Sequence, residues 1–192
     1  MATMNAEQVG VGSAAATGAI FVASKDTSLP TDASSTLTSF TLLGFTSDAG
    51  VQISESSSTE AIRAWEGRTE VYNVRSEYTE NVSFMPIQCN ADVAKLIWGE
   101  DKVTVDSVTG AIHAKHHGGT IDPVNIVIET TPRTGIVKRY CGTFQLDERG
   151  EVTMDGTQVD ARQLTFKAVA DENGITMHEY TAFITGATGT TN

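Results

Sequence analysis

The sequence predicts a mainly β fold, a two-sheet β-sandwich or barrel with one flanking α-helix. Only 19% of the 192 residues are charged, and Ser, Thr and Gly are abundant, a composition that favours strands and turns over disorder. Residues 69–87 alternate between apolar and polar side chains, which is the two-residue period of a strand. Residues 90–98 alone have convincing helical spacing. About seven strands are therefore expected beside a single helix.

The length and charge of the chain limit its organisation and its partners. We expect one domain, residues 18–184, between a flexible N-terminal arm at 1–17 and a flexible C-terminal tail at 185–192. The formal net charge of −11 argues against binding to phosphate backbones, because such binding uses Lys and Arg. No apolar run approaches the roughly 18 residues of a membrane span, and no signal-peptide pattern is present. We therefore expect a soluble protein that is made in a cytoplasm and has no membrane partner.

Turn-forming residues divide the domain into short strands. Pro30 and Asp32 mark a loop between a first strand at 18–24 and a second at 38–46. Further strands are expected at residues 124–131, 136–146, 163–170 and 175–184, separated by turns at 133–135, 147–150 and 171–174. The Asn-Gly pair in the last of these turns is typical of a hairpin.

The segment at 47–68 is interpreted as a long loop. Its polar cluster at 55–60 is typical of a solvated loop, and loops of this length often serve binding. Ile62 and Trp65 follow as an apolar pair three residues apart. Gly44, Asp48 and Gly50 are expected to end the preceding strand and to aim this loop away from the domain.

The strand at 69–87 has two different faces. One face is expected to be buried and consists of Tyr72, Val74, Ser76, Tyr78, Glu80, Val82 and Phe84. The other face is expected to be wet and consists of Asn73, Arg75, Glu77, Thr79, Asn81 and Ser83. A bulge is expected at Ser76 or Glu80.

The helix at 90–98 has recognisable start and stop signals. Asn90 is a favourable N-cap, and Gly99 is a plausible stop. Val93, Leu96 and Ile97 fall on one stripe, so the helix can pack on a sheet.

Little in the sequence could carry chemistry. His113, His116 and His117 form a cluster that could bind zinc, but a solvated loop is the preferred interpretation. Cys89 and Cys141 lack CxxC spacing, which favours two thiols over one disulfide. Paired catalytic carboxylates, GxSxG, HExxH and P-loop motifs are missing. We therefore expect no enzyme activity, no cofactor and no metal site.

Four segments, taken in order, resemble the major tail (tail tube) proteins of long-tailed bacteriophages, of the siphophage type and particularly from phages of actinobacteria. The segments are "GAIFVASKDTSLPTDASSTLTSFTLLGFTSDAGV", "EAIRAWEGRTEVYNVRSEYTENVSF", "NADVAKLIWG" and "LTFKAVADENGITMHEY", which together span residues 18–180. They are similar to the family's "TxLPTDA" loop and "LG" strand end, its Ala-Trp step into a long strand, its helix ending in Gly, and its C-terminal hairpin.

The resemblance implies a structural subunit of the virion tail. Six copies would form a ring whose inner sheets join into a barrel, and stacked rings would form a tube. The tube would house the tape measure protein, contact tail terminator and tail-tip proteins, and conduct double-stranded DNA during ejection. The segment at 47–68 would reach the neighbouring ring, with candidate contacts at Asp48, Val51, Ile53, Ile62 and Trp65.

The resemblance also raises the question of what lines the tube. The candidate lumen-facing residues are Arg75, Glu77, Thr79, Asn81 and Ser83. A basic lumen would bind phosphates and stall the DNA, so we expect an acidic, polar lining. Arg68 and Arg75 depart from that expectation.

Two alternatives stay open at this point. A head-decoration or adhesin domain would share the acidity and the strand count, but would not need a long loop that leads into a two-faced strand. A metal-dependent hydrolase on a β scaffold would depend on the three clustered histidines.

Overall fold

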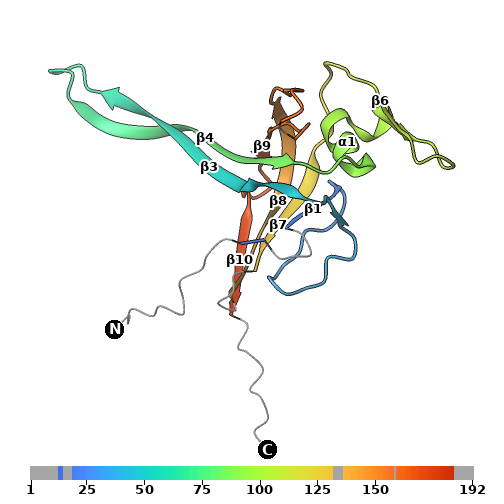
Figure 1. Cartoon of the computed structure of the whole chain (residues 1–192). Helices are drawn as coiled ribbons and strands as arrows, with labels where there is room; N and C mark the ends of the chain where they lie inside the picture. The colour runs from blue at the N-terminus through green and yellow to red at the C-terminus, as the bar shows by residue number, and fades with distance from the viewer. Residues whose placement is uncertain (1–12, 15–18, 132–135, 158, 184–192) are drawn as a thin grey trace, which may run out of the picture.

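The computed structural model describes residues 13–14, 19–131, 136–157 and 159–183. Over this part of the chain the fold is mainly β, with one α-helix and two sheets (Figure 1), as the composition and periodicity predict. The expected C-terminal tail, most of the N-terminal arm and the turn at 133–135 lie outside the described residues.

The larger sheet joins eight strands, all antiparallel to their neighbours. Seven follow the order β2 (Thr41–Leu42), β1 (Ile20–Ser24), β7 (Val124–Thr130), β8 (Ile136–Arg149), β9 (Leu164–Val169), β4 (Glu70–Pro86) and β3 (Thr46–Arg63). The eighth, β10 (His178–Phe183), pairs with β8. The smaller sheet is a hairpin of β5 (Val103–Val105) and β6 (Ile112–Ala114), which a short 3-10 helix (Glu100–Lys102) joins to α1 (Ala91–Trp98).

Strands β9 and β10 share one edge of β8. The first half of β8 pairs with β10 and the second half with β9, and Gly142 lies between the two halves. A Cβ atom at Gly142 would lie 2.7 Å from the backbone oxygen of Thr176, so only glycine allows the chain to cross here. The predicted turn at 171–174 is confirmed, since Gly174 donates to the Asp171 carbonyl at 3.0 Å. The predicted hairpin is wrong, because both strands pair with β8 and not with each other.

Three other sequence expectations about the strands and their connections need correction. The segment at 47–68 is not a loop, because most of it is β3, paired along its length with β4. The strand expected at 38–46 shrinks to β2 and the first residue of β3. The turn expected at 147–150 is mostly strand as well: β8 runs through Arg149 and skips Asp147 in its register with β9. Polar, turn-like composition misled the interpretation of residues 47–68 and 147–150, whereas residues 38–46 contain an apolar run but pair with β1 only at Thr41 and Leu42.

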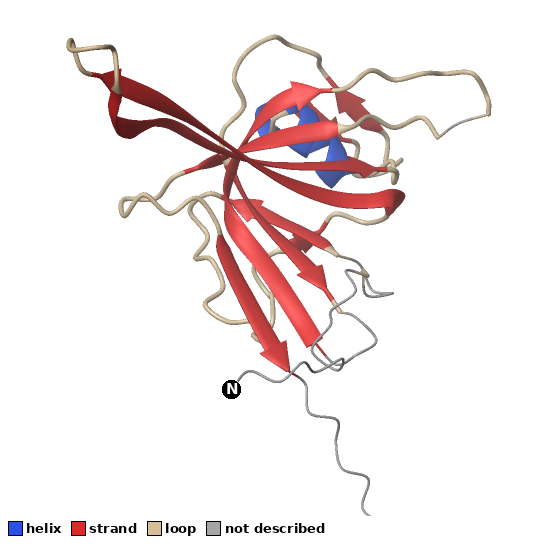
Figure 2. Cartoon of the chain, turned by 90° about the vertical axis from the view of Figure 1, so that its left-hand side faces the viewer, coloured by secondary structure: helices blue, strands red, loops and turns tan. Residues whose placement is uncertain are grey.

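The helix forms as predicted and completes the main core. Asn90 Oδ1 accepts from the Val93 amide at 2.7 Å, and Gly99 follows with φ +90°. Val93, Leu96 and Ile97 are buried in one cluster with side chains of the large sheet. Phe84 of β4 and Phe166 of β9 stack there with ring centroids 5.4 Å apart. Figure 2 shows the helix against the strands of the body, with the β3–β4 pair leading away from it.

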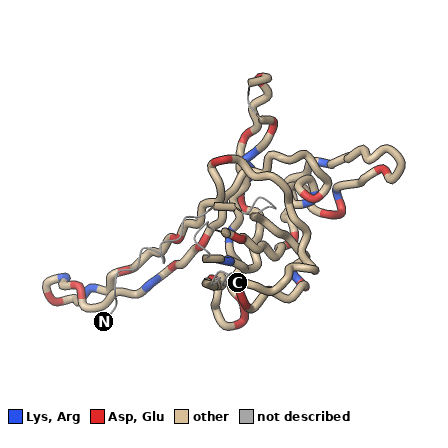
Figure 3. Tube along the Cα trace, turned by 60° about the horizontal axis from the view of Figure 1, so that its bottom comes forward, with Lys and Arg blue, Asp and Glu red and all other residues tan. Residues whose placement is uncertain are grey.

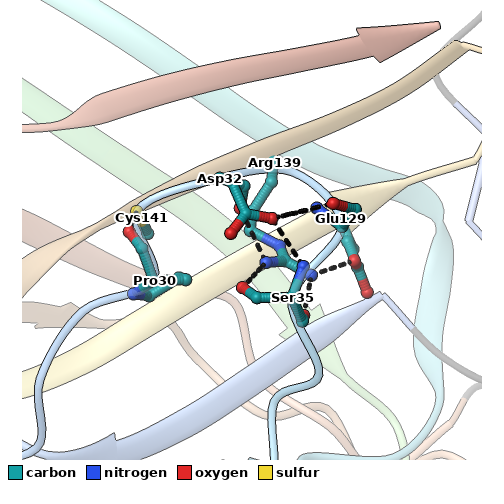
Figure 4. Close-up of polar contacts among 7 residues, drawn as sticks. Pro30, Asp32, Ser35, Glu129, Arg139 and Cys141 are labelled. Carbon is teal, nitrogen blue, oxygen red and sulfur yellow. Dashed lines mark hydrogen bonds and ion pairs between the residues drawn. The ribbon is translucent and has the colours of Figure 1, made fainter.

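The opposite face of β8 is covered by the loop that follows β1. Phe144 belongs to the helix-side core, so the odd-numbered Arg139 points the other way. Arg139 is 2% exposed and is fully engaged at its two terminal nitrogens. It donates to the carbonyls of Asp32 and Ser35 and to the Ser35 hydroxyl, and forms an ion pair with Glu129 at 2.7 Å (Figure 4). Arg139 therefore anchors the "LPTDASS" segment on this face of β8.

Asp32 shapes that loop from within. Its Oδ1 accepts from the amides of Ser34 and Ser35, both at 2.6 Å. These hydrogen bonds lower the pKa of the Asp32 carboxyl, because they stabilise its charged form. Downstream, Gly44 has φ +105°, and a Cβ atom there would overlap the Gln88 side chain. Gly44 lies in the connection between β2 and β3, whereas Gly50, also expected to end a strand, lies within β3.

Candidate interaction surfaces

A long two-stranded hairpin projects from the body. We call the part at residues 55–80 the arm, because β4 pairs with β9 only from Asn81 to Phe84, and outward of this the two strands pair only with each other. At about 3.3 Å per residue, the stretch from Asn81 to Glu70 extends roughly 35 Å. In Figure 1 the arm leaves the body on the left, and Figure 3 shows charges of both signs along it.

A bulge divides the arm. Ser58 pairs with Glu77 while Thr59 pairs with Arg75, so Ser76 is the extra residue. This confirms the expected bulge at Ser76. The Ser58 and Ser76 hydroxyls lie 2.8 Å apart. Because β3 continues its alternation while β4 gains a residue, the β4 side chains beyond Ser76 exchange faces.

The exchange corrects the predicted wet face. The Arg75 guanidinium carbon lies 5.8 Å from the centroid of the Tyr78 ring. In a regular strand, side chains three residues apart point to opposite faces, so this contact depends on the bulge. Arg75 and Asn73 both leave the predicted wet face, because they lie beyond the bulge, and its other four members, Glu77, Thr79, Asn81 and Ser83, still share one face. We call this the polar face, and its residues on these two strands are Ser54, Ser56 and Ser58 of β3 with Glu77, Thr79, Asn81 and Ser83 of β4.

The predicted buried face holds only near the body. Glu80, Val82 and Phe84 are buried as expected. Tyr72, Val74 and Tyr78 are exposed, because none of the described residues forms a second layer under the arm. The bulge also moves Tyr72 and Val74 to the side of Ile62, and Ile62 pairs directly with Tyr72.

The end of the arm is a preformed turn that presents an apolar surface. The Ala64 amide donates to the Thr69 carbonyl at 2.8 Å, and Gly67 and Arg68 both have positive φ, +67° and +53°. Arg68 is the only described residue other than glycine in that region, a strained conformation that often marks a functional site. The exposed tip patch consists of Ile62, Trp65, Val71, Tyr72 and Val74.

The five predicted ring-contact residues do not come together. Ile62 and Trp65 belong to the tip patch, and Trp65 is 95% exposed. Asp48, Val51 and Ile53 lie at the base of β3, and Val51 packs against the main core. About 30 Å of strand separates Ile53 from Ile62. The contacts expected for Asp48, Val51 and Ile53 stay predictions.

A second surface surrounds Trp98 at the end of α1. The His116 ring stacks on Trp98 with centroids 3.7 Å apart, and the guanidinium groups of Arg149 and Arg162 lie 4.9 and 5.5 Å from the same ring. His117 is hydrogen-bonded to the Trp98 carbonyl at 2.8 Å. Two of the three clustered histidines are therefore packed and not simply solvated.

Sequence reasoning missed the arginines because they lie far from Trp98 in the chain. His113 lies apart from the other two histidines, in β6. Among the described residues, no group of three or more His, Cys, Asp and Glu side chains could hold a metal ion.

A groove lies beside Trp98. It has a volume of about 300 Å³ and opens between α1 and the segment at 152–162. Val93, Ile97 and Met154 contribute apolar side chains, while Cys89, Asp160 and Arg162 also line it. Cys89 and Cys141 are free thiols, as predicted. Cys141 is buried, and its burial raises its pKa to about 11, whereas Cys89 is exposed at the groove.

These features define a class of protein: a β-rich structural subunit with an exposed arm suited to contact other molecules. Residues 2–184 match the model of the phage tail tube protein family, so the chain belongs to that family. Membership implies assembly with itself and with other tail components, a place in the virion tail, and a structural role in preference to a catalytic one. Comparison with curated proteins finds no match. Among the described residues, no helix is long and apolar enough to cross a membrane.

Proposed function

We propose that this chain forms hexameric rings that stack into the tail tube, and that the arm joins one ring to the next. The arm is the observation that supports this proposal. It holds an apolar tip roughly 35 Å from the body, where no other described part of the chain covers it. An exposed apolar patch of this kind usually marks a contact with another molecule, and buried aromatic side chains dominate the energy of such contacts.

The polar face is our candidate for the lumen. It continues from β4 onto β9, where Thr165 pairs with Ser83 and Lys167 pairs with Asn81. Its hydroxyl and amide groups outnumber its charges, and Glu77 offsets Lys167. A lining with so few cations can form few attractive contacts with DNA phosphates. This revises the acidic lining expected from the sequence to a polar lining of low charge.

The tube would first house the tape measure protein and then conduct DNA. The tail terminator and tail-tip proteins would bind the two ends of the stack through the surfaces that rings otherwise offer each other. None of these roles needs a catalytic group or a cofactor.

Electron microscopy over a concentration series tests the assembly. The purified protein is expected to form six-fold rings or hollow tubes, and Trp65→Ala to raise the concentration at which they form by about tenfold or more, the effect of losing one interface anchor. Val108→Ala, which removes another exposed apolar side chain outside both the arm and the groove, measures the general effect of losing such a side chain. Tubes from Trp65→Ala at the wild-type concentration would remove the arm from the inter-ring contact.

Phage particles test the lining. Thr79→Lys adds six cations to every proposed ring, and is expected to slow DNA ejection most at low salt, where phosphate contacts are strongest. Thr104→Lys in β5, away from the polar face, serves as the matched control. Equal ejection rates at all salt concentrations would exclude this face from the lumen.

A further inference from the structure

We propose that the tip of the arm binds the groove beside α1 of a second copy, with Trp65 in the groove and Glu66 against Arg162. This inference rests on the proposed function, because it names the receiving surface for the inter-ring arm. The donor and the receptor are both present on each chain, so each copy can give one contact and receive another.

The groove is suited to an indole ring. Its volume of about 300 Å³ is roughly ten times the space of one water molecule, which is ample for one large side chain. Apolar groups from α1 and from the segment at 152–162 form its walls. Trp65 is the most exposed large apolar side chain of the described residues, and the turn around it is held by two residues of positive φ. A preformed tip loses little conformational freedom on binding.

The charges around the groove complement those of the tip. Arg149 and Arg162 stack on Trp98, and neither forms an ion pair with a carboxylate among the described residues. Glu66 follows Trp65 directly and is also free of ion pairs within the described chain. Asp160 lines the same groove and would face the basic side chains of the tip, Arg63 and Arg68. Such pairs set orientation more than affinity.

The placement of the two surfaces suits stacking. In Figure 1 the arm leaves the body on one side, while α1 and the β5–β6 hairpin lie on the other. The arm therefore points away from its own groove. A protrusion on one copy that binds a recess on the next copy is a head-to-tail contact. Such contacts continue from copy to copy, as in a filament, unless the rotation between neighbouring copies closes them into a ring. Repeated contacts of this kind between rings would extend a tube.

The native thiol in the groove allows a direct test. Glu66→Cys places a thiol at the tip, and Cys89 of the receiving copy lies at the groove. Assembled tubes of Glu66→Cys, mildly oxidised, are expected to give disulfide-linked dimers and longer oligomers on non-reducing gels, because the two Cα atoms would lie within the roughly 7 Å that a disulfide spans and each copy would be linked to two neighbours. Cys141 is buried and cannot compete. The dimers should vanish in Glu66→Cys with Cys89→Ser, and in Ser57→Cys, whose thiol is midway along the arm.

Each outcome of the crosslinking bears on one proposal. Tubes of Glu66→Cys that give no Cys89-dependent dimer would overturn the groove as receptor while leaving the tube intact. Failure of the wild-type chain to form rings or tubes at any concentration, or with purified tail-tip complex added as initiator, would instead overturn the proposed function.

A charge exchange gives a second, independent test. Arg162→Glu and Glu66→Arg are each expected to raise the critical concentration for tubes, and the double variant to restore at least part of the loss. Arg162→Glu with no effect on assembly, or no recovery in the double variant, would contradict the pairing of these two residues.

Discussion

The two halves of β4 belong to one continuous strand, but only one half has a layer to pack on. Val82 and Phe84 are fully buried between the helix and the sheet, whereas Tyr72 and Val74 have the same kind of side chain and are exposed. Alternation of apolar residues therefore identifies a strand without saying whether anything covers it. Apolar side chains on an uncovered strand point to a contact that a single subunit does not contain.

The largest expected effect is the difference in stability between a substitution in the buried half of β4 and one in its exposed half. Phe84→Ala is expected to lower the free energy of unfolding by about 3–5 kcal/mol, since it leaves a cavity in the core. Tyr72→Ala is expected to change it by about 0.5 kcal/mol or less, as at other exposed sites. Urea denaturation of the unassembled protein measures both. A loss at Tyr72 as large as at Phe84 would mean that the arm packs on something within the free subunit.

A buried and an exposed arginine extend the comparison. Arg139→Met is expected to cost about 3 kcal/mol, near the lower limit for breaking a buried ion pair, because Glu129 keeps partial contact with solvent. Arg75→Met, on the arm, serves as the control and is expected to cost about 0.5 kcal/mol or less. Thermal unfolding measures both. An Arg139→Met protein as stable as the wild type would show that the loop after β1 needs no such anchor.

Inserting one serine between Ser58 and Thr59 sharpens the comparison, because it changes the faces of the distal arm while keeping every side chain of the arm. The inserted residue can pair with Ser76, so the ladder loses its bulge, and Ile62, Tyr72 and Val74 turn together to the side of Tyr78. The melting curve of the free subunit is expected to stay nearly unchanged, and tube formation to be lost. Ser76→Ala, which keeps the bulge, should still form tubes. Normal tubes from the insertion variant would show that the faces of the distal arm do not matter for assembly.

The smallest expected effect is on the pH dependence of folding stability, and it arises from Asp32 in the body of the subunit. The pKa of Asp32 is lowered by its hydrogen bonds to the Ser34 and Ser35 amides. Its contribution to stability is therefore complete above the unfolded pKa of about 4 and is lost as the pH falls through the lower folded value. Asp32→Asn should flatten the fall in stability below pH 4 in denaturation curves. Glu172→Gln, at an exposed turn, is the control, and an equal slope in Asp32→Asn would refute the assignment.

Much of the body could be predicted from the sequence because its signals are local. The helix, its Asn90 cap and its buried stripe follow from residues within one short segment, and so does β7. In the arm, the β4 half follows from its alternation, and the bulge lies at Ser76, one of the two expected positions. The β3 half could not be predicted as a strand, because it is rich in Ser, lacks an apolar face and has the composition of a loop.

The Trp98 surface was beyond sequence reasoning for a different reason. Arg149 and Arg162 reach Trp98 through the pairing of strands far apart in the chain, and no spacing in the sequence reports that approach. The same holds for Arg139 and the loop that it anchors.

Hydrogen exchange of the free subunit and of assembled tubes tests the central claim, that the arm is completed by another copy. In the free subunit, amides of the arm are expected to exchange much faster than those of β7 and β8, because local opening of an uncovered hairpin costs little. In tubes, the amides near the tip should slow by about tenfold or more, a gain of roughly 1.4 kcal/mol in protection, while β7 and β8 change little. Tubes in which the arm exchanges as fast as in the free subunit would contradict the account.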